Sequence, residues 1–281
     1  MTVAANMVKV ACCQLAPYIG DANQNRTLTE EAIRLAAEQG AKIIVLPELV
    51  QSGYVLKDRD EALRVAETQD GPTLSLWMAL AQELSLVIVG GFCESLPDQR
   101  VANSAALVST VGLLAVYRKA HLWDREHLIF EPGEQPPPVV ETMFGRLSMM
   151  ICYDLEFPEW VRLPALQGAD LLCVPVNWPD ALRPSGVSPA EVTRVQANAS
   201  VNRMFIAACD RCGHERGVDW IGGSVIVDAD GYRQSEILDG HQAMTIFSSI
   251  DLTEARNKRV SAHNDVHRDR RPSLYAGLIN D

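Results

Sequence analysis

The chain has 281 residues, 47% of them hydrophobic, and a formal net charge of -11 at pH 7. This length and apolar fraction suffice for a folded core, and the composition excludes collagen-like, disordered and coiled-coil chains. The acidic balance argues against nucleic acids and anionic membranes as partners, because a surface that binds either needs clustered Lys and Arg. No apolar run approaches the roughly 18 residues of a membrane span.

Seven cysteines are an odd number for a disulfide framework. Six of them lie in or beside apolar, strand-like runs: Cys12, Cys13, Cys93, Cys152, Cys173 and Cys209. This placement is typical of reduced thiols, and residues 1–7 lack the segments of a signal peptide, so we expect a cytoplasmic protein. Cys209 and Cys212, with His214 nearby, lack the second ligand pair of a zinc site. We therefore expect neither a metal nor a cofactor.

In the first half of the chain, strand-like apolar runs alternate with amphipathic helical patterns. Strands are expected at 8–15, 42–46 and 86–93, with helices at 23–39 and from 71 between them. The polar segment 49–70 is predicted to be a loop. Two further strands, 104–109 and 113–118, are joined by a Thr110-Val111-Gly112 turn, which indicates an antiparallel hairpin.

The second half repeats the alternation after an irregular segment, 120–138, that is rich in Pro and charge. Strands are expected at 146–151, 171–176, 205–209, 222–228 and 244–251, with helices at 157–166 and 189–204. Alternating strands and helices with added hairpins indicate an α/β protein with a mixed sheet. No Gly-, Ser- or Pro-rich linker divides the chain. We expect one domain over 1–281, with a C-terminal tail from about residue 256.

The stretch from Arg146 to Glu159 contains the candidate nucleophile, Cys152. An apolar run climbs to Cys152, after which polar residues turn the chain into a helical pattern. A cysteine on such a turn lies beside a helix N-terminus, whose partial positive charge favours a thiolate. The alternative is a small buried residue at a strand end, since free cysteine is among the most buried residue types.

Two other strand-like segments also end in ionisable residues, Glu48 and Lys119. Ligands of open α/β sheets bind at the carboxyl ends of strands, so both side chains can converge with Cys152 on one pocket. Glu48 would act as general base, and Lys119 would stabilise an oxyanion together with the N–H of Tyr153. Taken alone, Glu48 could cap the next element and Lys119 could be a surface charge. His121 is an alternative base that its position does not support.

Several short motifs follow one another along the chain. They are Leu46-Pro47-Glu48 with Gly53-Tyr54, Tyr117-Arg118-Lys119-Ala120-His121-Leu122 with Phe130-Glu131-Pro132-Gly133, Ile151-Cys152-Tyr153-Asp154 with Phe157-Pro158-Glu159, and then Gly168-Ala169-Asp170, Gly223-Ser224 and Arg270-Arg271-Pro272. In this order they resemble the nitrilase superfamily of carbon-nitrogen hydrolases. The resemblance covers nearly the whole chain.

The resemblance implies a Glu-Lys-Cys triad at Glu48, Lys119 and Cys152, the residues already chosen from the strand ends. It implies a four-layer α-β-β-α sandwich with two mixed sheets. It also implies pairing through the helices that flank the nucleophile, often with a C-terminal tail over the partner, and hence a homodimer or higher homo-oligomer. Many members carry a further glutamate that positions the substrate, which the spacing places at Glu126, with Glu131 as the competitor.

Other positions are candidates for the pocket. Asn177 and Trp178 follow the strand after the nucleophile, although Trp178 is nearly as well explained by core packing. Tyr54 and Tyr153 belong to the motifs, and we place them among the substrate-positioning residues. Asn198 and Val201 stand where many members carry Arg and Glu, so the contacts made there must differ.

The run from Tyr153 to Glu159 resembles amidases rather than nitrilases, which usually have Trp-Glu after the cysteine. Glu156 and Glu159 are explained by the dipole of the following helix, and binding of a substrate ammonium is the alternative. The expected reaction is hydrolysis of a small aliphatic amide to a carboxylic acid and ammonia through a thioester at Cys152. Hydrolysis of an N-carbamoyl amine or amino acid is the alternative, followed by nitrile hydrolysis and by a non-catalytic binding protein on this fold.

Overall fold

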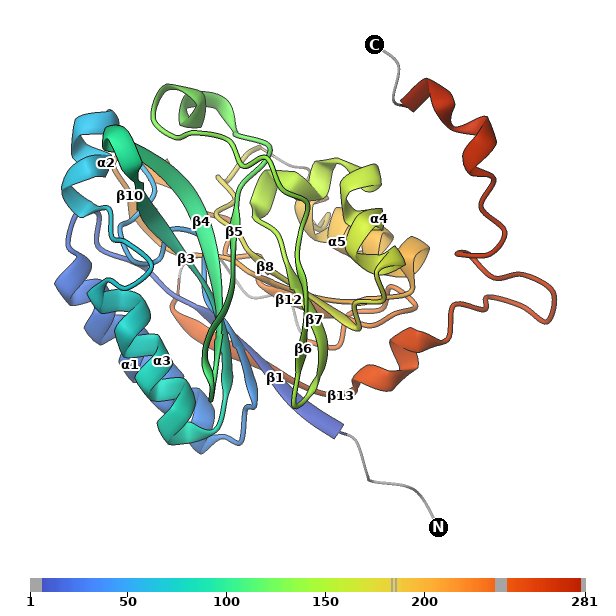
Figure 1. Ribbon diagram of the computed structural model, residues 1–281. Helices are drawn as coiled ribbons and strands as arrows, with labels where there is room; N and C mark the ends of the chain where they lie inside the picture. The colour runs from blue at the N-terminus through green and yellow to red at the C-terminus, as the bar shows by residue number, and fades with distance from the viewer. Residues whose placement is uncertain (1–6, 183, 185, 236–241, 279–281) are drawn as a thin grey trace.

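The computed structural model describes residues 7–182, 184, 186–235 and 242–278. Its strands form two large mixed sheets that face each other, with helices on both outer sides (Figure 1). The predicted four-layer α-β-β-α sandwich is confirmed by this arrangement. Residues 1–6, on which the expectation of no signal peptide depends, lie outside the described residues.

The first sheet has six strands in the order β13-β1-β2-β3-β4-β5. They are β1 (Met7–Gln14), β2 (Ile43–Val45), β3 (Val87–Leu96), β4 (Arg100–Ser109), β5 (Gly112–Arg118) and β13 (Met244–Asp251). The three strands β1, β2 and β3 are parallel, whereas β4, β5 and β13 pair antiparallel to their neighbours. The 104–118 hairpin is therefore present, with β4 longer than expected.

The second sheet has five strands in the order β12-β9-β8-β7-β6. They are β6 (Val139–Thr142), β7 (Gly145–Met149), β8 (Leu171–Pro175), β9 (Phe205–Cys209) and β12 (Val225–Val227). Here β7, β8 and β9 are parallel, and the outer strands are antiparallel. A separate short hairpin consists of β10 (His214–Glu215) and β11 (Val218–Asp219).

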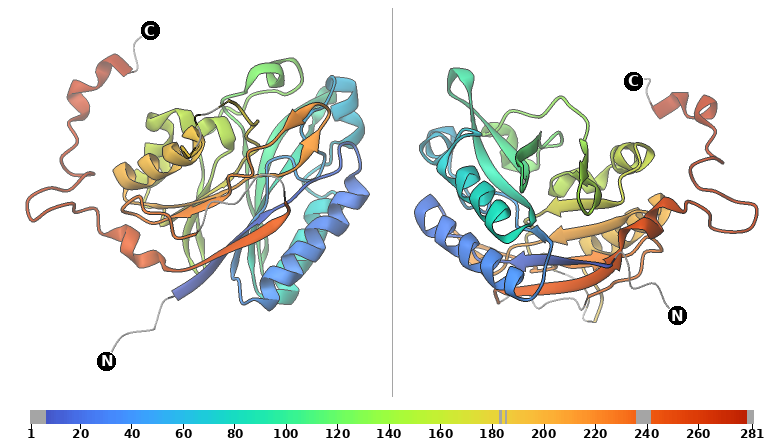
Figure 2. Two further views of the ribbon diagram at one scale, coloured as in Figure 1. Left: turned by 180° about the vertical axis from the view of Figure 1, so that it is seen from behind. Right: turned by 60° about the horizontal axis from the view of Figure 1, so that its bottom comes forward.

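Helices α1 (Ala22–Glu38) and α3 (Pro72–Leu84) cover the first sheet, and α4 (Pro158–Leu166) and α5 (Ala190–Asn202) cover the second (Figure 2). The buried Trp77 of α3 joins the first pair, since its Nε1 donates to Thr29 Oγ1 of α1 at 3.2 Å. Short 3-10 turns complete the elements: η1 (Pro97–Gln99), η2 (Asp124–Leu128), η3 (Cys152–Glu156), η4 (Leu252–Arg256), η5 (Pro272–Leu274) and η6 (Ala276–Leu278). No helix in the described ranges has the length and apolar character needed to cross a membrane.

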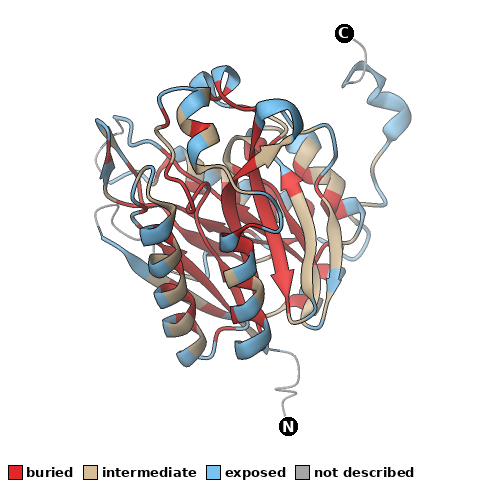
Figure 3. Cartoon of the chain, turned by 60° about the vertical axis from the view of Figure 1, so that its left-hand side comes forward, coloured by how far each residue is buried: buried red, intermediate tan, exposed pale blue. Residues whose placement is uncertain are grey.

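The main core lies between the two sheets, whose central strands are buried (Figure 3). Val10 and Val45 of the first sheet belong to the same buried cluster as Met149 and Val174 of the second. Each fully buried side chain of this size stabilises the fold by about 1.5–3 kcal/mol. This shared core supports the expectation of one domain, which stays a prediction.

Helix α2 (Arg59–Val65), strand β6 and the β10–β11 hairpin were not expected from the sequence. Helix α2 lies inside the segment 49–70, which we predicted to be a loop. Asp58 caps it by accepting the N–H of Glu61 at 2.8 Å, but only Ala62 of the helix is buried, so its apolar pattern is too short to see. Strand β6 is also short and only half-buried, and β7 provides its pairing partner.

The C-terminal tail leaves the body of the protein after η4 (Figures 1 and 2). Residues 257–278 contain the 3-10 turns η5 and η6 but neither an α-helix nor a named strand. Val260, Leu274 and Leu278 are large apolar side chains that are more than half exposed, at 55%, 64% and 73%. The tail expected from about residue 256 is thus seen to start at the end of η4.

Candidate active site

Glu48 and Lys119 meet at one edge of the first sheet. Glu48 follows β2, and Lys119 follows β5; the two antiparallel pairings from β3 through β4 to β5 give β5 the same direction as β2. Lys119 Nζ lies 2.7 Å from Glu48 Oε1, and both side chains are fully buried. This burial excludes a surface charge at Lys119 and leaves an ion pair within the protein.

Glu126 is the second carboxylate on the same ammonium. Lys119 Nζ lies 2.8 Å from Glu126 Oε1, and the N–H of Trp123 donates to Glu126 Oε2 at 2.9 Å, which holds the side chain inward from η2. Glu131, the competing assignment, instead pairs with Arg59 at 2.9 Å and is partly exposed. The geometry therefore favours Glu126 as the additional site carboxylate.

Asn103 was missed by the sequence analysis. Its side-chain Nδ2 donates to Glu48 Oε1 at 2.7 Å and to Glu126 Oε1 at 3.4 Å. Its backbone carbonyl accepts the backbone N–H of Lys119 at 2.9 Å. The side chain is fully buried on β4. A buried amide needs hydrogen-bond partners, so an Asn beside Ser104 in the strand-like run from Val101 to Val108 was the available signal.

Cys152 lies across from this group, on the second sheet. It opens η3 with φ of +45°, a left-handed conformation that is strained for a residue with a side chain. Its Sγ lies 3.7 Å from the carbonyl oxygen of Asn177, and the Nδ2 of Asn177 donates to the carbonyl of Glu48 at 2.8 Å. Asn177 thus connects the segments that carry the thiol and the carboxylate.

Asp154 fixes the turn that carries Cys152. Its Oδ2 accepts the N–H of Ile151 at 3.0 Å and the hydroxyl of Tyr117 at 2.7 Å. Its Oδ1 accepts the N–H of His121 at 3.1 Å and lies 2.7 Å from His121 Nδ1. His121 is therefore a partner of this turn, and the structure gives no contact between it and the thiol.

Burial sets the charge states of the site. Burial and, next, the charge of Glu48 raise the pKa of the Cys152 thiol well above its usual value, although Lys119 opposes them. The helix end was expected to favour a thiolate, but η3 separates Cys152 from α4, and the resting thiol is neutral. Burial also raises the pKa of Glu48 to about 7. Burial alone would lower the pKa of Lys119. The negative charges of Glu126 and Glu48 outweigh this effect, so the pKa is raised and Lys119 stays an ammonium.

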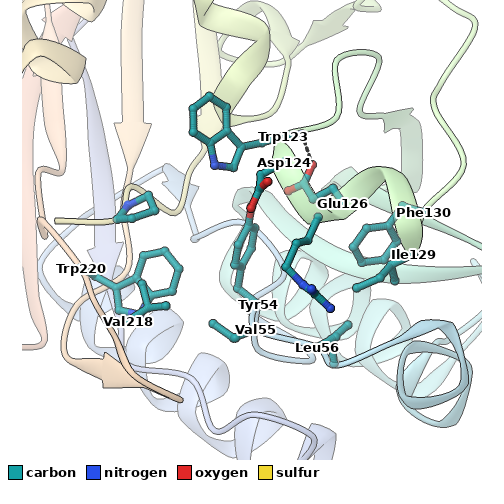
Figure 4. Close-up of a pocket in the computed structure, with 12 residues that line it drawn as sticks. Tyr54, Val55, Leu56, Trp123, Asp124, Glu126, Ile129, Phe130, Val218 and Trp220 are labelled. Carbon is teal, nitrogen blue, oxygen red and sulfur yellow. Dashed lines mark hydrogen bonds between the residues drawn. The ribbon is translucent and has the colours of Figure 1, made fainter. Parts of the chain in front are cut away.

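A pocket of about 190 Å³ opens beside Glu126 (Figure 4). It is bounded mainly by aromatic and aliphatic side chains, with charged groups from η2: Tyr54, Val55, Leu56, Trp123, Asp124, Arg125, Glu126, Ile129, Phe130, Pro179, Val218 and Trp220. Burial, followed by the charges of Glu126 and Glu48, raises the pKa of Tyr54 well above 10, so its hydroxyl is neutral. Such a volume accommodates only a small substrate.

Three predicted pocket residues, Tyr153, Asn177 and Trp178, do not line this cavity. The ring of Tyr153 packs against those of Trp123 and Phe157, at centroid distances of 4.9 and 5.2 Å. Trp178 is 5% exposed and belongs to the core between the sheets. Its backbone N–H donates to Asp210 Oδ1 at 3.0 Å. The core-packing alternative for Trp178 is the one the structure realises.

Asn198 and Val201, which stand where many family members carry Arg and Glu, both lie on α5. Asn198 Nδ2 donates to the carbonyl of Leu155 in η3 at 2.9 Å, whereas Val201 is 49% exposed on α5. Glu156 pairs with Arg194 at 2.8 Å. Neither Glu156 nor the exposed Glu159 lines the pocket, so neither is placed to bind a substrate ammonium there.

All seven cysteines are unpaired, as expected for reduced thiols. Over the described ranges, no group of three or more His, Cys, Asp or Glu side chains is arranged to hold a metal ion. The expectations of cofactor-free chemistry and of a cytoplasmic location stay predictions.

The sequence profile of the family described as "Carbon-nitrogen hydrolase" matches residues 9–259. The chain belongs to the carbon-nitrogen hydrolase family. This confirms the resemblance to the nitrilase superfamily and identifies the protein as a hydrolase of carbon-nitrogen bonds.

Named relatives of this carbon-nitrogen hydrolase differ in substrate. It is 35% identical to a nitrilase from Pyrococcus abyssi, covering 96% of this chain and 99% of the relative. It is 31% identical to an N-carbamoylputrescine amidase from Solanum lycopersicum, covering 97% and 95%. An amidase from Nesterenkonia sp. superposes with a TM-score of 0.83 at 27% identity, covering 99% and 98%. Variants of that amidase have been solved with butyramide and with a covalent adduct at the active-site cysteine.

Thiol accessibility gives a direct test of the site geometry. Iodoacetamide should alkylate the native protein at Cys152 alone, because the other six cysteines are buried. The rate should rise with pH, since the pKa of this thiol is raised. Peptide mass spectrometry locates the label, and Cys152→Ala should take up none under native conditions. Earlier labelling of a core cysteine would contradict the geometry.

Proposed function

We propose that the protein hydrolyses a small aliphatic amide to a carboxylic acid and ammonia, with Cys152 as nucleophile. One observation carries the proposal. Glu48 Oε1 is bonded to Lys119 and Asn103, whereas the buried Oε2 has no hydrogen-bond partner among the described residues. The charge of Glu48 acts on the neutral thiol of Cys152, and an unpaired carboxylate oxygen in this position is suited to accept the thiol proton.

In the first half-reaction, Glu48 Oε2 takes the proton of the Cys152 thiol as Sγ bonds to the amide carbonyl carbon. The carbonyl oxygen becomes an oxyanion. The tetrahedral intermediate then collapses, the carbon-nitrogen bond breaks, and Glu48 returns the proton to the departing nitrogen. Ammonia leaves, and the acyl group stays on Cys152 as a thioester.

Lys119 is the main candidate for oxyanion stabilisation. An ammonium has three N–H donors, and two of them are directed to Glu48 and Glu126. The third has no partner among the described residues and is available to the developing negative charge. The N–H of Tyr153, directly after the nucleophile, is the second donor we assign.

In the second half-reaction, Glu48 removes a proton from water, whose oxygen attacks the thioester carbon. The carbon-sulfur bond breaks as the second tetrahedral intermediate collapses. The proton on Glu48 then passes to the sulfur, which restores the neutral thiol. The sum is one amide and one water converted to one carboxylic acid and one ammonia.

The size and walls of the pocket favour short acyl groups. Leu56, Ile129 and Val218 offer apolar contact in a pocket of about 190 Å³, which suits a small substrate. The named butyramide complex and the acetamide-derived cysteine adduct of the Nesterenkonia amidase are consistent with this substrate class.

A second candidate is hydrolysis of an N-carbamoyl amine or amino acid. The relative named N-carbamoylputrescine amidase favours it, and Asp124 and Arg125 provide charged groups at the same pocket. The same steps would release ammonia first and then, by hydrolysis of the carbamoyl thioester, carbon dioxide and an amine. Carbon dioxide in the products distinguishes it from a simple amide, and a nitrile substrate is tested in the same screen.

Loss of the nucleophile tests the mechanism. Wild type should release ammonia from acetamide, propionamide or butyramide, and Cys152→Ala should lower kcat/KM by about four orders of magnitude or more, because the covalent path is removed. Acid-quenched mass spectrometry should detect the acyl group on Cys152. Cys173→Ala, which alters a core thiol outside the pocket, is the matched control and should retain activity. Undiminished ammonia release from Cys152→Ala would rule out the proposal.

The pH dependence tests the assignment of Glu48 as base. Since its pKa is raised to about 7, the carboxyl is protonated and unable to accept the thiol proton at lower pH. We expect kcat/KM to fall about tenfold per pH unit on the acid side of this value. Steady-state rates in a constant-ionic-strength buffer series measure the profile. A flat profile through the acid range in an otherwise stable enzyme would refute this role.

We also propose that the protein forms a homodimer or higher homo-oligomer through the face of α4 and α5, with the tail over the partner. Leu166 and Val201 on this face are 39% and 49% exposed. The exposed Leu274 and Leu278 of the tail find no core within their own chain. These exposed apolar side chains on α4, α5 and the tail support the proposed contact.

Light scattering measures the association. Wild type should show a mass of at least twice 30.9 kDa at micromolar concentration. The double change Leu274→Ser and Leu278→Ser should weaken association, since it removes apolar area from the tail. Val111→Ser, at an apolar position in the β4–β5 turn that is even more exposed, should leave the mass unchanged. A monomeric wild type would contradict the assembly.

A further inference from the structure

A buried ion pair lies behind the pocket wall and outside the proposed catalytic group. Arg211 follows β9 and is 1% exposed, and Glu215 in β10 is 4% exposed. Arg211 Nη1 lies 2.7 Å from Glu215 Oε2. Neither residue lines the pocket. Isolated buried ions are costly, so each must be satisfied by further contacts.

The carboxylate of Glu215 holds the backbone of one pocket wall. Its Oε1 accepts the N–H of Tyr54 at 2.9 Å and that of Val55 at 2.6 Å. The approach is close because residue 53 is glycine: its φ is +79°, and a Cβ there would lie 2.9 Å from Glu215 Oε2. Tyr54 and Val55 both line the cavity, so Glu215 determines where this wall stands.

The guanidinium of Arg211 supports a second wall. It lies over the ring of Trp220, 4.7 Å from the centroid, which is a favourable cation–π arrangement. Tyr54 meets the same ring edge to face, with centroids 5.4 Å apart (Figure 4). One ion pair therefore holds both aromatic rings, Tyr54 through its backbone and Trp220 through its face.

We propose that Arg211 and Glu215 are positioning residues that set the width of the acyl pocket and thereby select amides by chain length. They act through Tyr54 and Trp220 and touch no reacting atom. The inference deepens, and rests on, the proposed amidase function. Without the carboxylate, two wall N–H groups lose their acceptor and the Arg211 guanidinium loses its counter-charge, so both rings are free to shift.

A second ion pair joins the same two segments from the solvent side. Arg216 Nη1 and Nη2 each lie 2.7 Å from Glu61 of α2, and Arg216 Nη1 also donates to the carbonyl of Val55 at 2.9 Å. Glu61 does not line the pocket. The two pairs link similar segments but differ in contact with the rings, so Glu61→Gln is a matched control.

The experiment compares acetamide with butyramide in wild type, Glu215→Ala, Glu215→Gln and Glu61→Gln. In Glu215→Ala we expect kcat/KM for butyramide to fall about tenfold more than for acetamide, mainly through KM, because displaced walls cost most where the acyl chain is long. Glu215→Gln keeps an oxygen acceptor for Tyr54 and Val55 and should shift the ratio by about threefold or less. Glu61→Gln should keep the wild-type ratio.

An equal fall in kcat/KM for both amides in Glu215→Ala would overturn the inference while leaving the proposed function standing. So would a change in the butyramide-to-acetamide ratio in Glu61→Gln as large as that in Glu215→Ala. A binding arm is independent of turnover: calorimetry with butyramide and acetamide on Cys152→Ala, with and without Glu215→Ala. If the doubly changed protein prefers butyramide over acetamide less strongly than Cys152→Ala does, the inference is supported. If this preference is unchanged, the inference is overturned. Absence of ammonia release from every amide by wild type would remove the proposed function alone.

Discussion

The ammonium of Lys119, held between two buried carboxylates, is the interaction on which the site depends. Its Nζ lies 2.7 Å from Glu48 and 2.8 Å from Glu126. Burying an ion costs several kcal/mol, and the second carboxylate adds negative charge that one ammonium cannot neutralise. This excess of negative charge is consistent with a neutral thiol at Cys152 and with the raised pKa of Glu48. The pairing that permits a buried lysine therefore also favours the protonation states that the proposed base, Glu48, and the proposed nucleophile, Cys152, require.

This arrangement requires that the two sheets be held at a fixed separation and orientation. Glu48 and Lys119 extend from the first sheet, whereas Cys152 extends from the second, so the core between the sheets sets their separation. Within the first sheet the backbone around Glu48 is also closely packed, since a Cβ at Gly91 of β3 would lie 2.7 Å from the Cα of Glu48. Left-handed backbone at Leu49, with φ of +47°, and at Cys152 is maintained by surrounding contacts such as those of Asp154.

Chemistry and selectivity are supported by different parts of the fold. The strand ends carry the proposed catalytic group, whereas the pocket walls come from the segment after Glu48, from η2 and from the region around the β10–β11 hairpin. The Arg211–Glu215 pair braces two of these walls without reaching the thiol. A wall held by its own buried pair can differ among relatives while the strand ends stay the same, which suits a family whose named members act on nitriles, amides and carbamoyl amines.

The sequence by itself determined an α/β protein with a mixed sheet and the strand-end positions of Glu48, Lys119 and Cys152, because buried strands have continuous apolar runs and their ends are local features. The four-layer sandwich followed from the family resemblance, and so did the further glutamate, which its spacing from Lys119 placed at Glu126. Only the tertiary structure selected Asn103, which reaches Glu48 across 55 residues, and Glu215, which reaches Tyr54 across 161. It also decided that Trp178 packs in the core and that the Cys152 thiol is neutral. Partners and charge states depend on burial and on distances between remote segments, which no local pattern encodes.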